Sequence, residues 1–166
     1  GVNTNAPHHV SGPRVPKMGD AVYMDIGGAY KHYWSDVTRS LHIGKPRERY
    51  VECYKHVREA YELAFAAIKP GIRACDVDKV ARDYLTAHDL GPYFNHRLGH
   101  GEGLDGHELP NLARDCEIIL EPGMAFSCEP GVYFKGEWGI RIEDTVCVTE
   151  TGARSFNHFT KELIIL

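Results

Sequence analysis

The sequence lacks any apolar run approaching the roughly 18 residues that a transmembrane helix needs. It also lacks a basic excess, since 19 Lys and Arg stand against 23 Asp and Glu for a net charge of −4. Nucleic-acid-binding proteins more often carry clustered positive charge. We therefore predict neither a membrane nor a nucleic-acid partner. The 43% apolar content is typical of a folded chain rather than a disordered one.

Cysteine is sparse as well, and its spacing excludes two structural roles. The five cysteines are widely separated and form no C-x-x-C pair, so neither a disulfide framework nor a zinc knuckle is indicated. Free thiols and no visible export signal favour a cytoplasmic location. The first residue is Gly1 rather than Met, so we expect the natural protein to begin earlier.

The order of hydrophobic patterns predicts an α+β fold within one domain. Apolar residues at three- and four-residue steps predict helices at 46–68 and 75–87. Gly27 and Gly28 predict a turn between strands at 21–26 and 29–34, with 37–43 extending the second strand. Further strands are predicted at 124–128, 140–149 and 161–166. This order predicts a mostly antiparallel sheet with helices on one face.

Ten histidines and several acids within apolar runs make metal chemistry worth considering. Four acids lie on predicted core strands: Asp25, Asp36, Glu129 and Glu143. A buried carboxylate is costly unless it is paired, so each needs its own Arg or Lys partner or all share a cation. With His100 in a glycine-rich loop, the shared cation is favoured. This oxygen-rich set suits Mn, Co, Fe or Zn, and two divalent ions would offset four negative charges.

Six short sequence motifs, in their residues and in their order along the chain, resemble the catalytic part of the pita-bread metallopeptidases. That superfamily includes prolidase, aminopeptidase P, methionine aminopeptidase and the metal-free creatinase. The Xaa-Pro peptidase branch is the most similar, and the resemblance covers nearly the whole chain. It implies the pita-bread fold, with a curved, mostly antiparallel sheet. The segments are MDIG at 24–27, SDVTR at 35–39, GHGEGLDGHE at 99–108, EPGM at 121–124, CEPGVY at 128–133 and GIRIED at 139–144.

The resemblance also implies a role for each acid and for His100. Asp25 would chelate one metal, and His100 and Glu129 would bind the other. Asp36 and Glu143 would bridge the two ions, which would be Mn, Co, Zn or Fe. A hydroxide between the metals would be the nucleophile. Glu129 or Glu143 would handle the proton of the attacking water.

Three more residues match positions near the substrate in this family. His8 and His107 would hydrogen-bond the scissile carbonyl, although His9 replaces His8 if its loop shifts by one residue. Arg141 would hold a metal-binding carboxylate or the carboxylate end of a dipeptide, or would simply pair with Asp144 or Glu143. The remaining histidines are expected to be structural or on the surface: His32, His42, His56, His88, His96 and His158. Two residues depart from the family's usual pattern: His32, where glycine is common, and Glu102, where an aliphatic residue is common.

The leading hypothesis is metal-dependent hydrolysis of Xaa-Pro bonds, with a peptide or dipeptide carrying proline in second position as substrate. Two alternatives remain open: a creatinase-like amidohydrolase for small molecules, and a non-catalytic pita-bread module that binds peptides or proteins. We expect residues 1–166 to form a partial catalytic domain that lacks the first helical pair and the N-terminal domain of the family. Because these parts are missing, we expect the sheet to have an uncovered apolar face. We also expect a homodimer.

Overall fold

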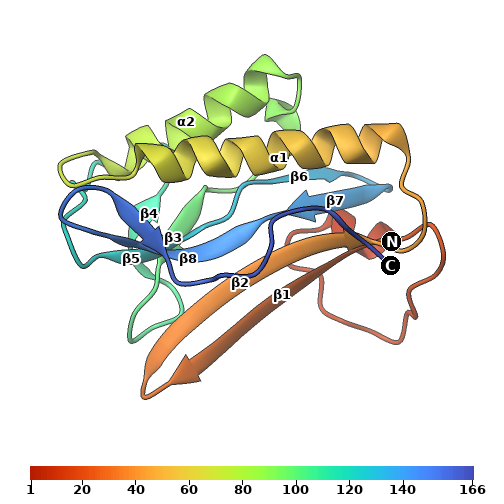
Figure 1. Ribbon diagram of the computed structural model, residues 1–166, viewed down its shortest axis with the longest axis horizontal. Helices are drawn as coiled ribbons and strands as arrows, with labels where there is room; N and C mark the ends of the chain where they lie inside the picture. Colours follow the sequence, from red (N-terminus) through yellow and green to blue (C-terminus); the bar gives the residue numbers. More distant parts are fainter.

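The computed structural model describes all residues from 1 to 166 and places two helices along one side of a curled sheet (Figure 1). The helices are α1 (Glu48–Ala67) and α2 (Ala74–Ala87), and two short 3-10 turns, Val2–Asn5 and Gly91–Tyr93, accompany them. Neither helix is long and apolar enough to cross a membrane. The strands are β1 (Ala21–Tyr30), β2 (Tyr33–His42), β3 (Gly99–Gly101), β4 (Glu108–Leu112), β5 (Ala125–Cys128), β6 (Gly131–Phe134), β7 (Trp138–Arg141), β8 (Glu143–Val148), β9 (Ala153–Ser155) and β10 (Ile164–Ile165).

The main sheet brings strands from both halves of the chain side by side. Its order is β1-β2-β8-β5-β3-β4, with β9 on β8 and β10 on β2, and β6 pairs with β7 in a separate sheet. Every pairing is antiparallel except that of β10 with β2. The predicted α+β class with a mostly antiparallel sheet is therefore confirmed. Because β8 lies beside β2 and β5 lies beside β8, acids distant in sequence come together.

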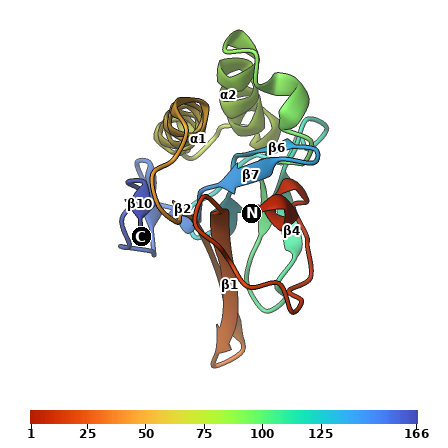
Figure 2. The same ribbon diagram turned by 90° about the vertical axis from the view of Figure 1, so that its right-hand side faces the viewer.

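Both predicted helices are present with nearly the predicted bounds. Tyr50, Tyr54, Val57 and Tyr61 recur at three- and four-residue steps, and all four are buried on the inner face of α1. They belong to a core of 26 buried residues. Figure 2 shows both helices above the sheet, with β1 extending away from them. This packing gives the sheet one covered face and leaves the other for the site.

The predicted turn at Gly27 and Gly28 is wrong. β1 continues through both glycines, and the chain reverses at Lys31 and His32, whose φ angles are 49° and 72°. Two positive φ angles give a two-residue turn whose twist matches that of the flanking strands. Consecutive glycines do not have to end a strand, since full backbone pairing continues past them. The resulting register sets Gly27 opposite Asp36.

The predicted strand at 140–149 is two strands in different sheets. Arg141 pairs with Gly131 on β6, whereas Asp144 pairs with Cys128 on β5. Ile142 lies between them and donates its N–H to Pro130 O at 3.3 Å. The predicted strand at 161–166 is limited to β10, and the short strands β3, β4, β6 and β9 were not predicted.

Exposed apolar side chains gather on the β1–β2 hairpin rather than across the whole sheet. Met24, Ile26, Tyr30, Tyr33 and Trp34 are between 45% and 76% exposed. The hairpin extends beyond the edge of the helical layer (Figure 1). Part of the expected uncovered apolar surface therefore lies on this hairpin, and Leu109 on β4 and Ile165 on β10 are exposed as well.

Candidate metal centre

A single polar cavity of about 470 Å³ collects the residues that the sequence singled out. No hydrophobic residue lines it. All eight predicted site residues lie on its wall: His8, Asp25, Asp36, His100, His107, Glu129, Arg141 and Glu143. Two residues that were not predicted, His96 and Arg97, complete the lining. His9 faces a different hollow near the N-terminus, so His8 is the histidine of this pair at the cavity.

Strand alternation explains why neighbouring acids have different surroundings. Asp144 faces the helices, where Tyr61 Oη donates to its Oδ2 at 2.8 Å and Arg39 and Lys161 approach to 2.6 Å. Glu143 precedes it and therefore faces the cavity. The interpretation of Arg141 as a partner for Asp144 is wrong, because Arg141 lies on the wall of the cavity whereas Asp144 faces the helices.

A close approach between β3 and β5 brings His100 into the cavity. A Cβ atom at Gly99 would lie 1.8 Å from Ser127 O, so no larger residue fits there without movement. Ser127 also accepts the His100 N–H on its Oγ at 3.1 Å and contacts Glu129 Oε1 at 3.2 Å. The same serine thus positions an imidazole and a carboxylate.

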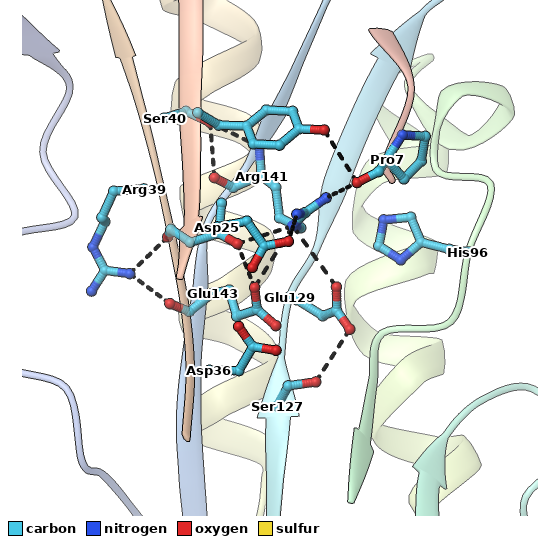
Figure 3. Close-up of polar contacts among 12 residues, drawn as sticks. Pro7, Asp25, Asp36, Arg39, Ser40, His96, Ser127, Glu129, Arg141 and Glu143 are labelled. Carbon is cyan, nitrogen blue, oxygen red and sulfur yellow. Dashed lines mark hydrogen bonds and ion pairs between the residues drawn. The ribbon is translucent and has the colours of Figure 1, made fainter. Parts of the chain in front are cut away.

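Arg141 is buried among the acids and is 2% exposed (Figure 3). It donates to Asp25 Oδ2 at 2.5 Å, Thr38 Oγ1 at 3.1 Å, Tyr133 Oη at 2.9 Å and Pro7 O at 3.0 Å. Four of the five N–H groups of a guanidinium are therefore used within the protein. Glu143 Oε2 and Glu129 Oε2 lie farther from it, at 3.7 and 3.9 Å. This pattern favours a role in holding Asp25.

The geometry of His100 is suited to a metal ligand. Its Nδ1 lies 3.2 Å from Gly101 O, so a proton on Nδ1 leaves the lone pair of Nε2 available. Nε2 lies 3.6 Å from Glu129 Oε1. Burial lowers the pKa of His100 to about 4, so the ring is neutral at pH 7. The His107 ring stacks on it with centroids 3.9 Å apart.

The carboxylates hold their protons more tightly than ordinary acids. Burial, followed by the charge of Asp25, raises the pKa of Asp36 to about 6. Burial raises the pKa of Glu129 to about 7, although Arg141 opposes the shift. Burial and then Glu129 raise the pKa of Glu143 as well. Like charges crowd together here without enough positive charge to balance them.

The donor set fits a divalent metal ion. Four side chains offer ligand atoms that all lie within 4.8 Å of one another: Asp36, His100, Glu102 and Glu143. Of all buried side-chain nitrogen and oxygen atoms, only Asp36 Oδ1 and Glu102 Oε1 lack a hydrogen-bond partner. Carboxylates and imidazole are ligands of Mn, Co, Fe and Zn. A cation would satisfy both unpaired oxygens.

Glu102 is the residue of this cluster that sequence reasoning did not assign to the site. The sequence contains only a weak signal for it, an acid inside a glycine-rich loop, and acids in loops are usually solvated. His96 was expected to be structural, and its ring contacts agree with that, since Nδ1 lies 2.7 Å from Arg97 O and Nε2 lies 3.1 Å from Tyr133 Oη. It nevertheless lines the cavity.

The curled sheet with its cavity of acids and histidines defines a metal-dependent hydrolase of the pita-bread type. Residues 1–150 match the model of metallopeptidase family M24. The chain belongs to this family.

Similar proteins cover almost the whole of this chain. It is 48% identical to the probable dipeptidase PepE of Mycobacterium tuberculosis over 96% of its length, and 40% identical to a Xaa-Pro dipeptidase of Pyrococcus horikoshii over 99%. These matches cover 43% and 47% of the relatives. The crystal structure of a dipeptidase from Pyrococcus horikoshii superposes with a TM-score of 0.97 at 45% identity, covering 99% of this chain and 46% of that one. The chain thus spans about half the length of the relatives it matches.

Proposed function

We propose that this chain acts in the hydrolysis of Xaa-Pro bonds, in a peptide or dipeptide with proline in second position. The observation that carries the proposal is the convergence of all eight expected side chains on one polar cavity. The similarity to a Xaa-Pro dipeptidase and a probable dipeptidase supports the same substrate class. Since the chain spans about half of those relatives, we further propose that residues 1–166 are part of a catalytic domain.

The proposed metal ligands divide into two groups. Asp25 would hold one divalent ion, His100 and Glu129 would hold the other, and Asp36 and Glu143 would serve both. When bound, two ions of Mn, Co, Zn or Fe would supply a nucleophilic hydroxide near neutral pH by acidifying a shared water. Glu129 or Glu143, as a carboxylate beside the water, would accept its proton.

The chain's other cavity residues orient the substrate. His8 and His107 line the same cavity and can donate N–H groups to the oxygen of the scissile carbonyl. Arg141 acts mainly by fixing Asp25, because its donors are engaged within the protein. A proline nitrogen carries no hydrogen, so selection would rest on ring shape and on the charged ends of a dipeptide.

Metal content and peptide cleavage test the proposal together. Protein stripped with a chelator is reloaded with Mn or Co, and bound metal is counted by elemental analysis beside an Asp36→Ala variant. We expect about two ions per chain in the unmodified protein, as carboxylate-bridged hydrolases hold, and fewer in the variant. Cleavage of Ala-Pro but not of the reversed dipeptide Pro-Ala is then expected. A chain that takes up no metal, or cleaves both dipeptides equally, contradicts the proposal.

The two alternative functions have distinct outcomes in the same experiment. Hydrolysis of creatine without Xaa-Pro cleavage would indicate the creatinase-like amidohydrolase. Peptide binding without cleavage, in metal-loaded protein, would indicate the non-catalytic module. The homodimer and the cytoplasmic location stay predictions, and light scattering of the purified chain tests the first.

A further inference from the structure

Glu102 is a buried acid that the proposed catalytic arrangement does not use. It follows β3 directly, is 4% exposed, and its N–H donates to Ala125 O at 3.0 Å. This backbone bond fixes the residue against β5. Thr145 Oγ1 contacts Glu102 Oε2 at 2.7 Å, but Oε1 has no hydrogen-bond partner. A buried carboxylate oxygen left without a partner is energetically unfavourable.

The unpaired oxygen belongs to a group of atoms with the size of a metal coordination sphere. Ligand atoms of Glu102, Asp36, His100 and Glu143 all lie within 4.8 Å of one another. Metal–oxygen and metal–nitrogen distances are about 2.0–2.2 Å, so ligands on opposite sides of one ion are about 4–4.4 Å apart. Small side-chain movements would therefore bring all four donors onto one ion.

Positive charge is unevenly distributed among these acids: it lies beside Asp25, whereas Glu102, which lies behind Asp36 rather than on the wall of the polar cavity, has no cation paired with it. Arg141 pairs with Asp25 at 2.5 Å and approaches Glu143 and Glu129 at 3.7 and 3.9 Å. Glu102 and Asp36 have no ion pair with any Lys, Arg or His. Thr145 links these two residues, since its Oγ1 also accepts the Asp36 N–H at 3.0 Å. Its single proton can go to Glu102 Oε2 at 2.7 Å or to the Asp36 backbone oxygen at 2.9 Å, and it reaches neither Glu102 Oε1 nor Asp36 Oδ1.

We propose that Glu102 is a sixth protein ligand of the metal centre, binding one divalent ion through Oε1 together with Asp36, His100 and Glu143. The assignment rests on the proposed metal-dependent function and adds a residue to it. With Glu102 added to Asp36, Glu129 and Glu143, that ion would have four carboxylates and one imidazole around it. Such a set is strongly anionic and favours hard divalent ions such as Mn over thiolate-preferring ones.

Titration with Co(II) tests the assignment without relying on activity. Chelator-stripped protein is titrated by calorimetry and by visible absorption, whose band shape reports the number and kind of ligands around cobalt. The variant is Glu102→Gln, which keeps the size of the side chain but removes its charge. Glu121→Gln is the matched control, because Glu121 is an exposed acid outside the cavity. Circular dichroism of the metal-free proteins shows that each variant is folded.

We expect Glu102→Gln to weaken one of the two binding events at least tenfold and to alter the cobalt spectrum. Glu121→Gln should match the unmodified protein in both measurements. Glu102→Asp, which retains the charge on a shorter side chain, should recover part of the affinity. Wild-type affinity and spectrum in Glu102→Gln, together with lost binding in Asp36→Asn, would overturn the assignment of Glu102 alone. An unmodified protein that binds no cobalt would overturn this assignment together with the proposed function.

Discussion

Raising the pH from 6.5 to 7.5 should destabilise the metal-free chain, because buried acids of the cavity then lose protons. Burial raises the pKa of Glu102 to about 8 and that of Glu129 to about 7, both from an ordinary value of 4.5. The folded state therefore binds more protons than the unfolded state in this range. Stability contributed by these protons is complete at low pH and is lost as the pH rises through the folded pKa values.

The size of the loss follows from the two shifts. If the folded state binds one more proton than the unfolded state across one pH unit, unfolding free energy falls by about 1.4 kcal/mol. Glu102 stays mostly protonated in the folded state over this range and nearly reaches that value. Glu129 is about half protonated on average and contributes about half of it.

Two histidines and the N-terminus oppose this loss. Burial lowers the pKa of His96 and His100 from 6.5 to about 4, so the unfolded state still releases their protons above pH 6.5 and each returns about 0.3 kcal/mol. Burial also lowers the pKa of the Gly1 amino group from 8.0, which acts in the same direction as the histidines. The net loss expected between pH 6.5 and pH 7.5 is therefore about 1 kcal/mol.

Urea unfolding in the presence of a chelator measures this loss, with tryptophan fluorescence as the signal. Unfolding free energy at pH 7.5 should be lower than at pH 6.5 by the stated amount. The double variant Glu102→Gln, Glu129→Gln should lose less stability over this range than the unmodified chain, since neither amide titrates. Saturating Mn should also remove the dependence, because a bound cation keeps both carboxylates ionised. Stability that is equal or higher at pH 7.5 in the metal-free protein would refute the reasoning.

Three further predictions concern proton release, close packing and the buried ion pairs. Binding of Mn at pH 6.5 should release about one proton or more per chain and fewer at pH 9, which calorimetry in buffers of different ionisation enthalpy measures. Gly99→Ala should cost about 2–3 kcal/mol in urea unfolding because its Cβ meets Ser127 O, whereas Gly28→Ala, with open space around it, should change stability by less than about 1 kcal/mol. Asp144→Ala should cost about 3–5 kcal/mol by leaving Arg39 buried without its partner, and Lys79→Ala, in an exposed pair, about 0.5 kcal/mol or less.

Local patterns were sufficient to predict the helices and most of the expected site residues. The spacing of apolar residues in α1 repeats over five turns, so its buried face could be read directly. The acids could be singled out because an apolar strand is expected to be buried, and a buried carboxylate is energetically unfavourable unless it has a partner. The order and spacing of six motifs along the chain then resembled a known family. That combined pattern identifies the site more specifically than any single residue does.

Long-range pairing explains what the sequence did not reveal. Whether Gly27 and Gly28 turn or continue depends on the pairing of all ten residues of β1 with β2, which includes both glycines and two residues beyond them. Glu102 is buried only because β3 lies between β4 and β5, which are formed by later residues. The break at Ile142, which puts Arg141 and Asp144 in different sheets, depends on two different partner strands.

The charges in the cavity connect its stability to its proposed chemistry. Four carboxylates line the cavity and Glu102 lies beside them, and Arg141 is the only arginine or lysine paired with any of the five, beside Asp25. The fold therefore carries a free-energy cost that a divalent ion beside Glu102 would remove. An ion present at a thousand times its dissociation constant stabilises the folded state by about 4 kcal/mol, which exceeds the predicted pH-dependent loss. Metal binding and folding should thus be linked. A substitution that removes one of these negative charges should stabilise the metal-free chain and weaken metal binding.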